Sequence, residues 1–150
     1  MIEAEQVRVA TVTWTGNLAT GSGRVSAATT GAFDDLPVSW AARTESPDGT
    51  TSPEELLAAA HAACFSMAFS SALTKDGTPP GQLEVTATVT FAKDETRWSI
   101  ASSHLEVRGR VEGSSQAAFA DAAQRAKDGC PVSRALKGNV EISVDAVLER

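Results

Sequence analysis

The chain of 150 residues has the length of one ordinary domain, and we expect residues 1–150 to form a single domain. With 42% hydrophobic and 21% charged residues it can build a packed core, and its net charge of −6 argues against binding to nucleic acid or to anionic membranes, which both need basic surfaces. Two cysteines and two histidines are too few ligands for a cysteine-rich zinc site.

The first third of the chain predicts β-structure. Residues 6–14 alternate small β-forming residues with polar ones, and residues 24–29 and 37–44 are typical of a second and a third strand. Glycine-containing turn signals, Gly16-Asn17 and Gly21-Ser22-Gly23, separate the first two strands.

A long helix over residues 53–75 is the clearest element. Ser52 suits its N-cap, Pro53 its first position and Glu55 the third position of a capping box, while Lys75 and Gly77 are typical of its end. The helix is apolar nearly all round, so we interpret it as a buried core helix rather than a membrane span. One chain of this size can hardly cover such a helix, and the pattern therefore favours a dimer.

The remaining elements complete an α+β order. Residues 83–91 alternate as a half-buried strand, and residues 98–111 predict another strand with a bulge near Ser102 and Ser103. Helices are expected over 114–128 and 132–137, followed by a last strand over 140–148. The sequence thus predicts hairpin-connected antiparallel strands around a long helix.

The two cysteines are the first candidates for chemistry. Cys64 lies within the long helix, where a free cysteine can also be a small core residue. Cys130 precedes Pro131 at the start of a helix, where the helix dipole lowers a thiol pKa, although an incidental cap is an equal alternative. If the fold brings them together, they form a reversible dithiol–disulfide couple.

A reactive thiolate also needs a nearby cation. Arg43 and Glu54 could form an oriented guanidinium–carboxylate pair, although residue chemistry alone favours a surface ion or a helix-dipole carboxylate for each. Ten residues of helix, about 15 Å, separate Glu54 from Cys64, so either Arg43 bridges them or a second subunit completes the site. His61 shares a helix face with Cys64 and is either a base or a core or interface histidine.

The expected compartment agrees with a redox role. Residues 1–5 lack the basic and apolar regions of a signal peptide, so we expect a cytoplasmic protein. In the cytosol a cysteine pair is more often catalytic or redox-active than a structural disulfide.

Two long motifs resemble the OsmC/Ohr family of osmotically inducible and organic-hydroperoxide-resistance proteins. The first is residues 51–68, TSPEELLAAAHAACFSMA, whose HAACF segment is similar to the OsmC branch; the second is residues 126–136, AKDGCPVSRAL. The resemblance covers nearly the whole chain. It implies the OsmC/Ohr-like fold, antiparallel sheets around a long central helix in an intertwined homodimer.

The resemblance also implies an activity: a thiol-dependent peroxidase of stress defence that reduces organic hydroperoxides and, as a second candidate, hydrogen peroxide. Cys64 matches the peroxidatic position, Cys130 the resolving position, and Arg43 and Glu54 the activating pair. Cys64 would become a sulfenic acid and then a Cys64–Cys130 disulfide, recycled by a dithiol of the lipoyl type. No metal, prosthetic group, nucleic acid or membrane partner is implied. Thr44 departs from the family, which has an aromatic residue after the arginine.

Two other functions remain open from the sequence. An OsmC-like dimer could hold an apolar ligand without turnover, or the cysteine pair could serve as a redox sensor. A Cys64 pKa near the ordinary thiol value of about 8.5 would favour the ligand-binding alternative.

Overall fold

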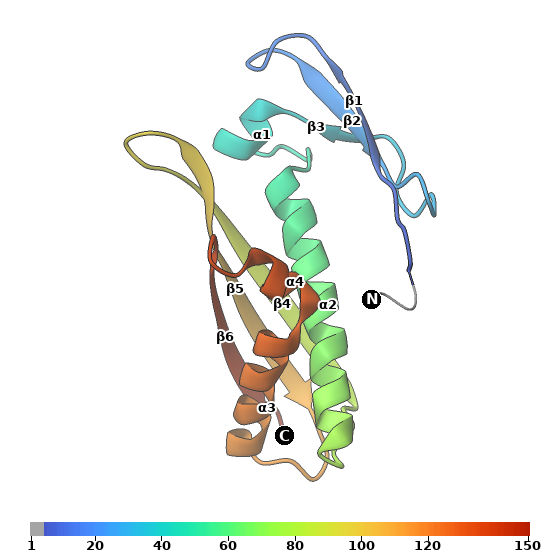
Figure 1. Cartoon of the computed structure of the whole chain (residues 1–150), viewed down its shortest axis with the longest axis vertical. Coiled ribbons are helices and arrows are strands. Elements are labelled where there is room, and N and C mark those ends of the chain that lie inside the picture. The colour runs from blue at the N-terminus through green and yellow to red at the C-terminus, as the bar shows by residue number, and fades with distance from the viewer. Residues whose placement is uncertain (1–4) are drawn as a thin grey trace. The chain divides into compact units, whose positions relative to one another are not determined.

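The computed structural model describes residues 5–150, which divide at Pro53 and Glu54 into an N-terminal and a C-terminal compact unit (Figure 1). The single domain over residues 1–150 stays a prediction. Most of the segment on which the absence of a signal peptide was judged, residues 1–4, lies outside the described residues.

The N-terminal unit is a small antiparallel sheet. Its strands β1 (Thr11–Thr15), β2 (Ser22–Ser26) and β3 (Leu36–Val38) are hydrogen-bonded in the order β1-β2-β3. Every residue of β1 is exposed, and β2 buries only Gly23 and Val25. The sheet therefore has little core of its own.

The strand expected over residues 37–44 is wrong beyond Val38. Residues Trp40–Thr44 form a short helix, α1, because the Ser39 side chain caps it by accepting a hydrogen bond from the Ala42 N–H at 3.2 Å. Arg43 therefore lies on a helix, with its guanidinium 5.5 Å from the Trp40 ring centroid.

The long helix α2 (Pro53–Lys75) has the predicted bounds. Beyond it Gly77 adopts φ +85°, a left-handed conformation that suits glycine, and the Thr78 N–H donates to the Leu73 carbonyl. Apart from Glu54 in the first turn, the buried residues of α2 form one stripe at four-residue spacing: His61, Phe65, Phe69 and Leu73.

Most other residues of α2 are half-buried or exposed within the described chain, where burial on most sides was expected. Met67 is 72% exposed, and 22% of the most apolar 18-residue stretch is buried. By length and mean hydropathy α2 could also cross a membrane, but core helices of soluble proteins share this property.

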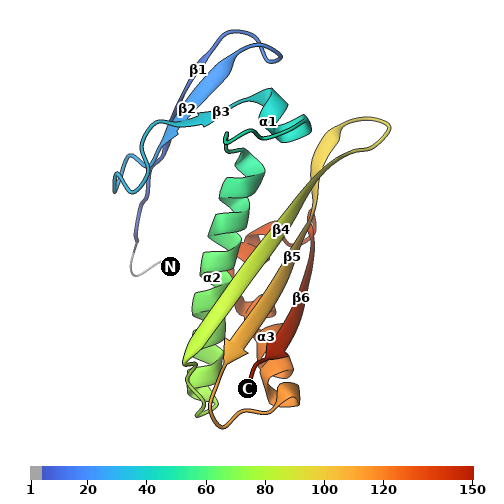
Figure 2. The ribbon, with the colours of Figure 1, turned by 180° about the vertical axis from the view of Figure 1, so that it is seen from behind.

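The C-terminal sheet has the order β4-β5-β6 (Figure 2). Strands β4 (Gln82–Lys93) and β5 (Trp98–Arg110) form the predicted antiparallel hairpin, with a register shift that leaves Ala101 unpaired, next to the predicted bulge. Strand β6 (Glu141–Leu148) instead runs parallel to β5. Helices α3 (Gln116–Gly129) and α4 (Pro131–Leu136) lie between them in sequence and supply the crossover that a parallel pair needs.

The core of this unit lies between the sheet and the helices α2 and α3. The ring of Phe69 of α2 packs between Phe65, at a centroid distance of 5.5 Å, and Phe119 of α3, at 4.9 Å. Leu105 and Val107 of β5 belong to the same buried cluster. All five are at most 1% exposed. The α+β class, with antiparallel strands and a long central helix, is confirmed.

Candidate functional site: a paired dithiol

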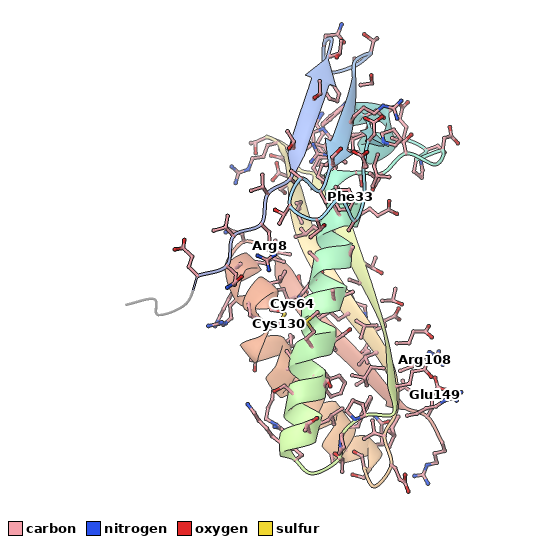
Figure 3. All side chains as sticks on the ribbon, turned by 90° about the vertical axis from the view of Figure 1, so that its right-hand side faces the viewer. Arg8, Phe33, Cys64, Arg108, Cys130 and Glu149 are labelled. Atoms are coloured by element: carbon pink, nitrogen blue, oxygen red, sulfur yellow. The ribbon has the colours of Figure 1, made fainter. Side chains whose placement is uncertain are left out.

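The structure brings Cys64 and Cys130 together. They are 66 positions apart in sequence, yet their side chains lie next to each other, close enough for each thiol to change the pKa of the other (Figure 3). Both are free thiols. The arrangement is a dithiol within one chain.

The junction of α3 and α4 fixes Cys130. Its N–H donates to the Ala126 carbonyl at the end of α3, and its carbonyl accepts from the Arg134 N–H in α4, at 2.8 and 2.9 Å. Pro131 occupies the first position of α4, where its missing N–H costs no hydrogen bond. The predicted N-cap position of Cys130 is confirmed.

The surroundings of Cys130 favour its thiolate. Burial by itself would raise the pKa of this thiol, but the N–H and hydroxyl of Ser133, the Cys64 thiol and the Val132 N–H face its sulfur and together hold the pKa below the ordinary value. The thiol makes no formal capping hydrogen bond to α4. Cys130 is fully buried.

Cys64 is the more accessible thiol, since it is partly exposed. Burial raises its pKa, and the adjacent Cys130 adds to this, while the Val132 N–H and the charge of Arg134 act in the opposite direction. With these neighbours, the Cys64 thiol is accessible but mostly protonated.

His61 is buried and faces two serines rather than acting as an exposed base. Its Nδ1 lies 2.6 Å from the Ser103 Oγ of β5, and its Nε2 lies 2.8 Å from the Ser133 Oγ of α4. Burial lowers the pKa of His61, so the ring is neutral at pH 7. Of the two readings of the sequence, the structure favours a core histidine, and it adds a link to Cys130 through Ser133.

Arg43 and Glu54 lie in different units of the chain. Arg43 is in α1 of the N-terminal unit, and Glu54, 7% exposed, is in the first turn of α2 in the C-terminal unit. Their pairing with each other and with Cys64 stays a prediction.

Sequence reasoning missed three polar residues around the cysteines: Ser103, Ser133 and Arg134. Ser133 had a detectable signal, because it follows Cys130 by three residues and so occupies the third position of α4, where N–H groups face the cap. Ser103 had none, since its contact with His61 spans 42 residues.

A cavity of about 240 Å³ lies between the end of α3, α4 and the start of β6. Three basic residues and one acidic residue line it, together with Ser133, Val140 and Ile142: Lys127, Arg134, Lys137 and Asp128. Neither cysteine is among its lining residues. Among residues 5–150, no group of three or more His, Cys, Asp or Glu side chains could hold a metal ion. The site consists of thiols, hydroxyls, an imidazole and cations.

Comparisons with known proteins show the family of the chain. Residues 46–145 match the family model described as OsmC-like protein. Peroxiredoxin OsmC of Escherichia coli is 39% identical over 91% of this chain and 92% of its own length. The organic hydroperoxide resistance protein OhrA of Bacillus subtilis is 30% identical over 74% of this chain and 77% of its own length.

Solved structures share the fold. The organic hydroperoxide resistance protein OhrB of Bacillus subtilis superposes with a TM-score of 0.73 at 25% identity, covering 93% of this chain and 98% of that one. An OsmC-like protein of Vibrio cholerae gives a TM-score of 0.74 at 15% identity, covering 95% of this chain and 100% of that one. The chain belongs to the OsmC family.

Proposed function

We propose that the protein is a cysteine-dependent peroxidase that reduces organic hydroperoxides, and as a second substrate hydrogen peroxide, in stress defence. The observation that carries the proposal is the pair of adjacent free thiols, Cys64 and Cys130. The names of the relatives, a peroxiredoxin and organic hydroperoxide resistance proteins, support the same chemistry.

Accessibility assigns the first step to Cys64. A peroxide must reach the attacking sulfur, and Cys64 is partly exposed whereas Cys130 is fully buried. The Cys64 thiolate attacks the distal peroxide oxygen: a sulfur–oxygen bond forms, the O–O bond breaks, and the departing alkoxide takes a proton to become the alcohol. Cys64 is left as a sulfenic acid.

Cys130 then resolves the sulfenic acid. Its sulfur displaces hydroxide from Cys64, which leaves as water after protonation, and an intramolecular disulfide forms. A dithiol reductant of the lipoyl type returns both cysteines to thiols and becomes a cyclic disulfide itself.

The raised pKa of Cys64 requires an activating cation, and we assign this role to Arg43, oriented by Glu54. The Arg43→Ala variant should show a higher pKa for Cys64 in a thiol-alkylation titration, and a slower first step at pH 7. Arg24→Ala, which removes an exposed arginine of β2, is the control and should change neither. An unchanged Cys64 pKa in Arg43→Ala would exclude Arg43 as the activating cation.

We also propose that the functional unit is an intertwined homodimer. Large apolar residues of the N-terminal unit are 40–62% exposed: Val7, Val9, Val12, Trp14 and Leu18. Met67 is 72% exposed on α2. A second copy that covers these surfaces would remove apolar area from water in both units. Burial of this kind stabilises a complex by about 25 cal/mol per Å² of apolar area.

A peroxidase assay tests the proposal. With an organic hydroperoxide and dihydrolipoamide, the wild type should turn over, Cys64→Ser should not, and Cys130→Ser should form one equivalent of sulfenic acid and then recycle poorly. Undiminished turnover in Cys64→Ser would overturn the assignment. Absence of turnover in the wild type, with tight binding of apolar ligands, would favour the ligand-binding alternative, and a reversible disulfide without turnover would favour a sensor.

A further inference from the structure

Among residues 5–150, His61 is the one buried titratable side chain near the cysteines that the proposed reaction does not use. It is completely buried at the N-terminal end of the α2 stripe. Both ring nitrogens are hydrogen-bonded to serine hydroxyls, Ser103 of β5 at 2.6 Å and Ser133 of α4 at 2.8 Å. The ring thus connects three elements through a polar chain inside an apolar core.

The polar chain ends on a cysteine. The Ser133 hydroxyl contacts Nε2 of His61, and Ser133 is the third residue of the helix whose N-cap is Cys130. From this position Ser133 lowers the pKa of the Cys130 thiol. The groups hydrogen-bonded to His61 are therefore the hydroxyls of Ser103 and Ser133, and beyond Ser133 lie the two thiols. The charge of Arg134 acts on Cys64.

A neutral imidazole gives the series of hydrogen bonds a direction. One ring nitrogen donates and the other accepts, so an Nε2–H donated to the Ser133 oxygen leaves Nδ1 to accept the Ser103 hydroxyl hydrogen. The Ser133 hydroxyl hydrogen is then free to point at the Cys130 sulfur. All three hydrogen bonds run the same way and polarise one another toward that sulfur.

We propose that His61 is a positioning residue for the resolving thiol: through Ser133 it aims a hydroxyl hydrogen at Cys130 and so sets the fraction of Cys130 that is thiolate when the disulfide closes. The inference rests on the proposed peroxidase function. The step is attack of the Cys130 thiolate on the Cys64 sulfenic acid. The S–S bond forms, the S–O bond breaks, and hydroxide leaves and is protonated to water, while the proton of Cys130 has gone to solvent.

The loss of the Ser133 hydroxyl should change the rate of disulfide closure in opposite directions at low and at high pH. Loss of one hydrogen bond to a thiolate is expected to raise the pKa of Cys130 by about one unit, which lowers the thiolate fraction about tenfold at a pH below that pKa. The more basic thiolate is about threefold more nucleophilic, because the Brønsted coefficient is about 0.4–0.5. Disulfide closure should therefore slow about threefold at low pH and become faster than wild type at high pH.

Three substitutions and one control test this. Ser133→Ala removes the hydroxyl with little change in volume, His61→Phe removes the ring nitrogens, and His61→Gln restores a donor near Nε2. Ser143→Ala is the control, because it breaks the other serine–histidine pair, Ser143 Oγ to His104 Nδ1 at 2.6 Å, away from the cysteines. Single-turnover reactions with an organic hydroperoxide are quenched at set times, and the sulfenic acid and disulfide are quantified by mass spectrometry between pH 5 and pH 10.

In Ser133→Ala and His61→Phe we expect unchanged sulfenic acid formation, slower closure at low pH, and a crossing of the wild-type profile at high pH. His61→Gln should lie between, the His61→Phe/Ser133→Ala double variant should match the single ones, and Ser143→Ala should match the wild type. A wild-type closure profile in Ser133→Ala would overturn the inference, even if His61→Phe does not fold. Absence of sulfenic acid on wild-type Cys64 would instead overturn the proposed function.

Discussion

The contact between Gly109 and Phe119 gives a sharp prediction about what holds the site in place. A Cβ added at Gly109 would lie 2.5 and 2.6 Å from the Cζ and Cε1 atoms of Phe119 and 3.0 Å from Cδ2 of Leu83. Gly109 pairs with Leu83 on one side and Leu148 on the other, so neighbouring strands restrict its backbone on both sides. Phe119 is fully buried, with its ring against Phe69. Gly109→Ala must therefore displace the Phe119 ring or the strand.

The cost follows from the distances. Carbon contacts are most favourable at about 3.5–4.0 Å, so the added methyl group is about 1 Å too close. Overpacking of this kind lowers the free energy of unfolding by about 1–3 kcal/mol. Replacing glycine by alanine also lowers the entropy of the unfolded chain, which offsets about 0.5 kcal/mol of this loss. We expect a net loss of about 1.5 kcal/mol and a Tm lower by about 4 °C.

Thermal unfolding followed by circular dichroism measures this loss, with Gly129→Ala as the matched control. Nothing lies within 4 Å of a Cβ at Gly129, the last residue of α3, so the control should match or exceed the wild-type Tm. Equal Tm values for the Gly109→Ala variant and the wild type would refute the packing of α3 on β5. Because α3 ends next to Cys130, the Gly109→Ala variant should also close the disulfide more slowly.

Three further predictions concern the surface, the core and a turn. Met67→Glu should convert the proposed dimer to monomers in sedimentation equilibrium, because the face of α2 that carries Met67 is exposed in the single chain. The control Thr88→Glu, at an exposed position of β4, should leave the dimer intact. A dimeric Met67→Glu variant would place the interface elsewhere. Burial lowers the pKa of His61, so as the pH falls the imidazole is protonated in the unfolded chain before it is protonated in the folded one. The free energy of unfolding should therefore fall as the pH drops below about 6.5, by at most about 1.4 kcal/mol per pH unit. His61→Phe should lose this part of the pH dependence, and the same pH dependence in the variant and the wild type would contradict the buried neutral ring. The Asp94 carboxylate accepts hydrogen bonds from the N–H groups of Thr96 and Arg97 and the Thr96 hydroxyl, which hold its pKa at about 2, and an NMR titration midpoint near 3.8 would show that the turn is open.

The long helix and the hairpin were predictable because their signals are local. Pro53 after a serine, and Lys75 followed by Gly77, mark the two ends of α2 within a few residues. The short helix α1 was missed because alternation over residues 37–44 resembles a strand, whereas the Ser39 cap decides the structure. The parallel direction of β6 has no signal in its own pattern, which is the same for either direction.

The cysteine pair was predictable from the resemblance of two motifs, but its polar surroundings were not. Spacing placed Cys130 at a helix start, and the structure adds that Ser133 faces its sulfur. The link from His61 to Ser133 spans 72 residues and depends on how α4 packs against α2, which no local pattern encodes.

The central claim is that Cys64 and Cys130 form one redox couple, and a single oxidation tests it most directly. The reduced protein is treated with one equivalent of an organic hydroperoxide, remaining thiols are alkylated, and peptides are mapped by mass spectrometry without reduction. The account predicts a Cys64–Cys130 disulfide within one chain, with one equivalent of alcohol released. Two alkylated cysteines after the peroxide is consumed, or a disulfide that joins two chains, would contradict it.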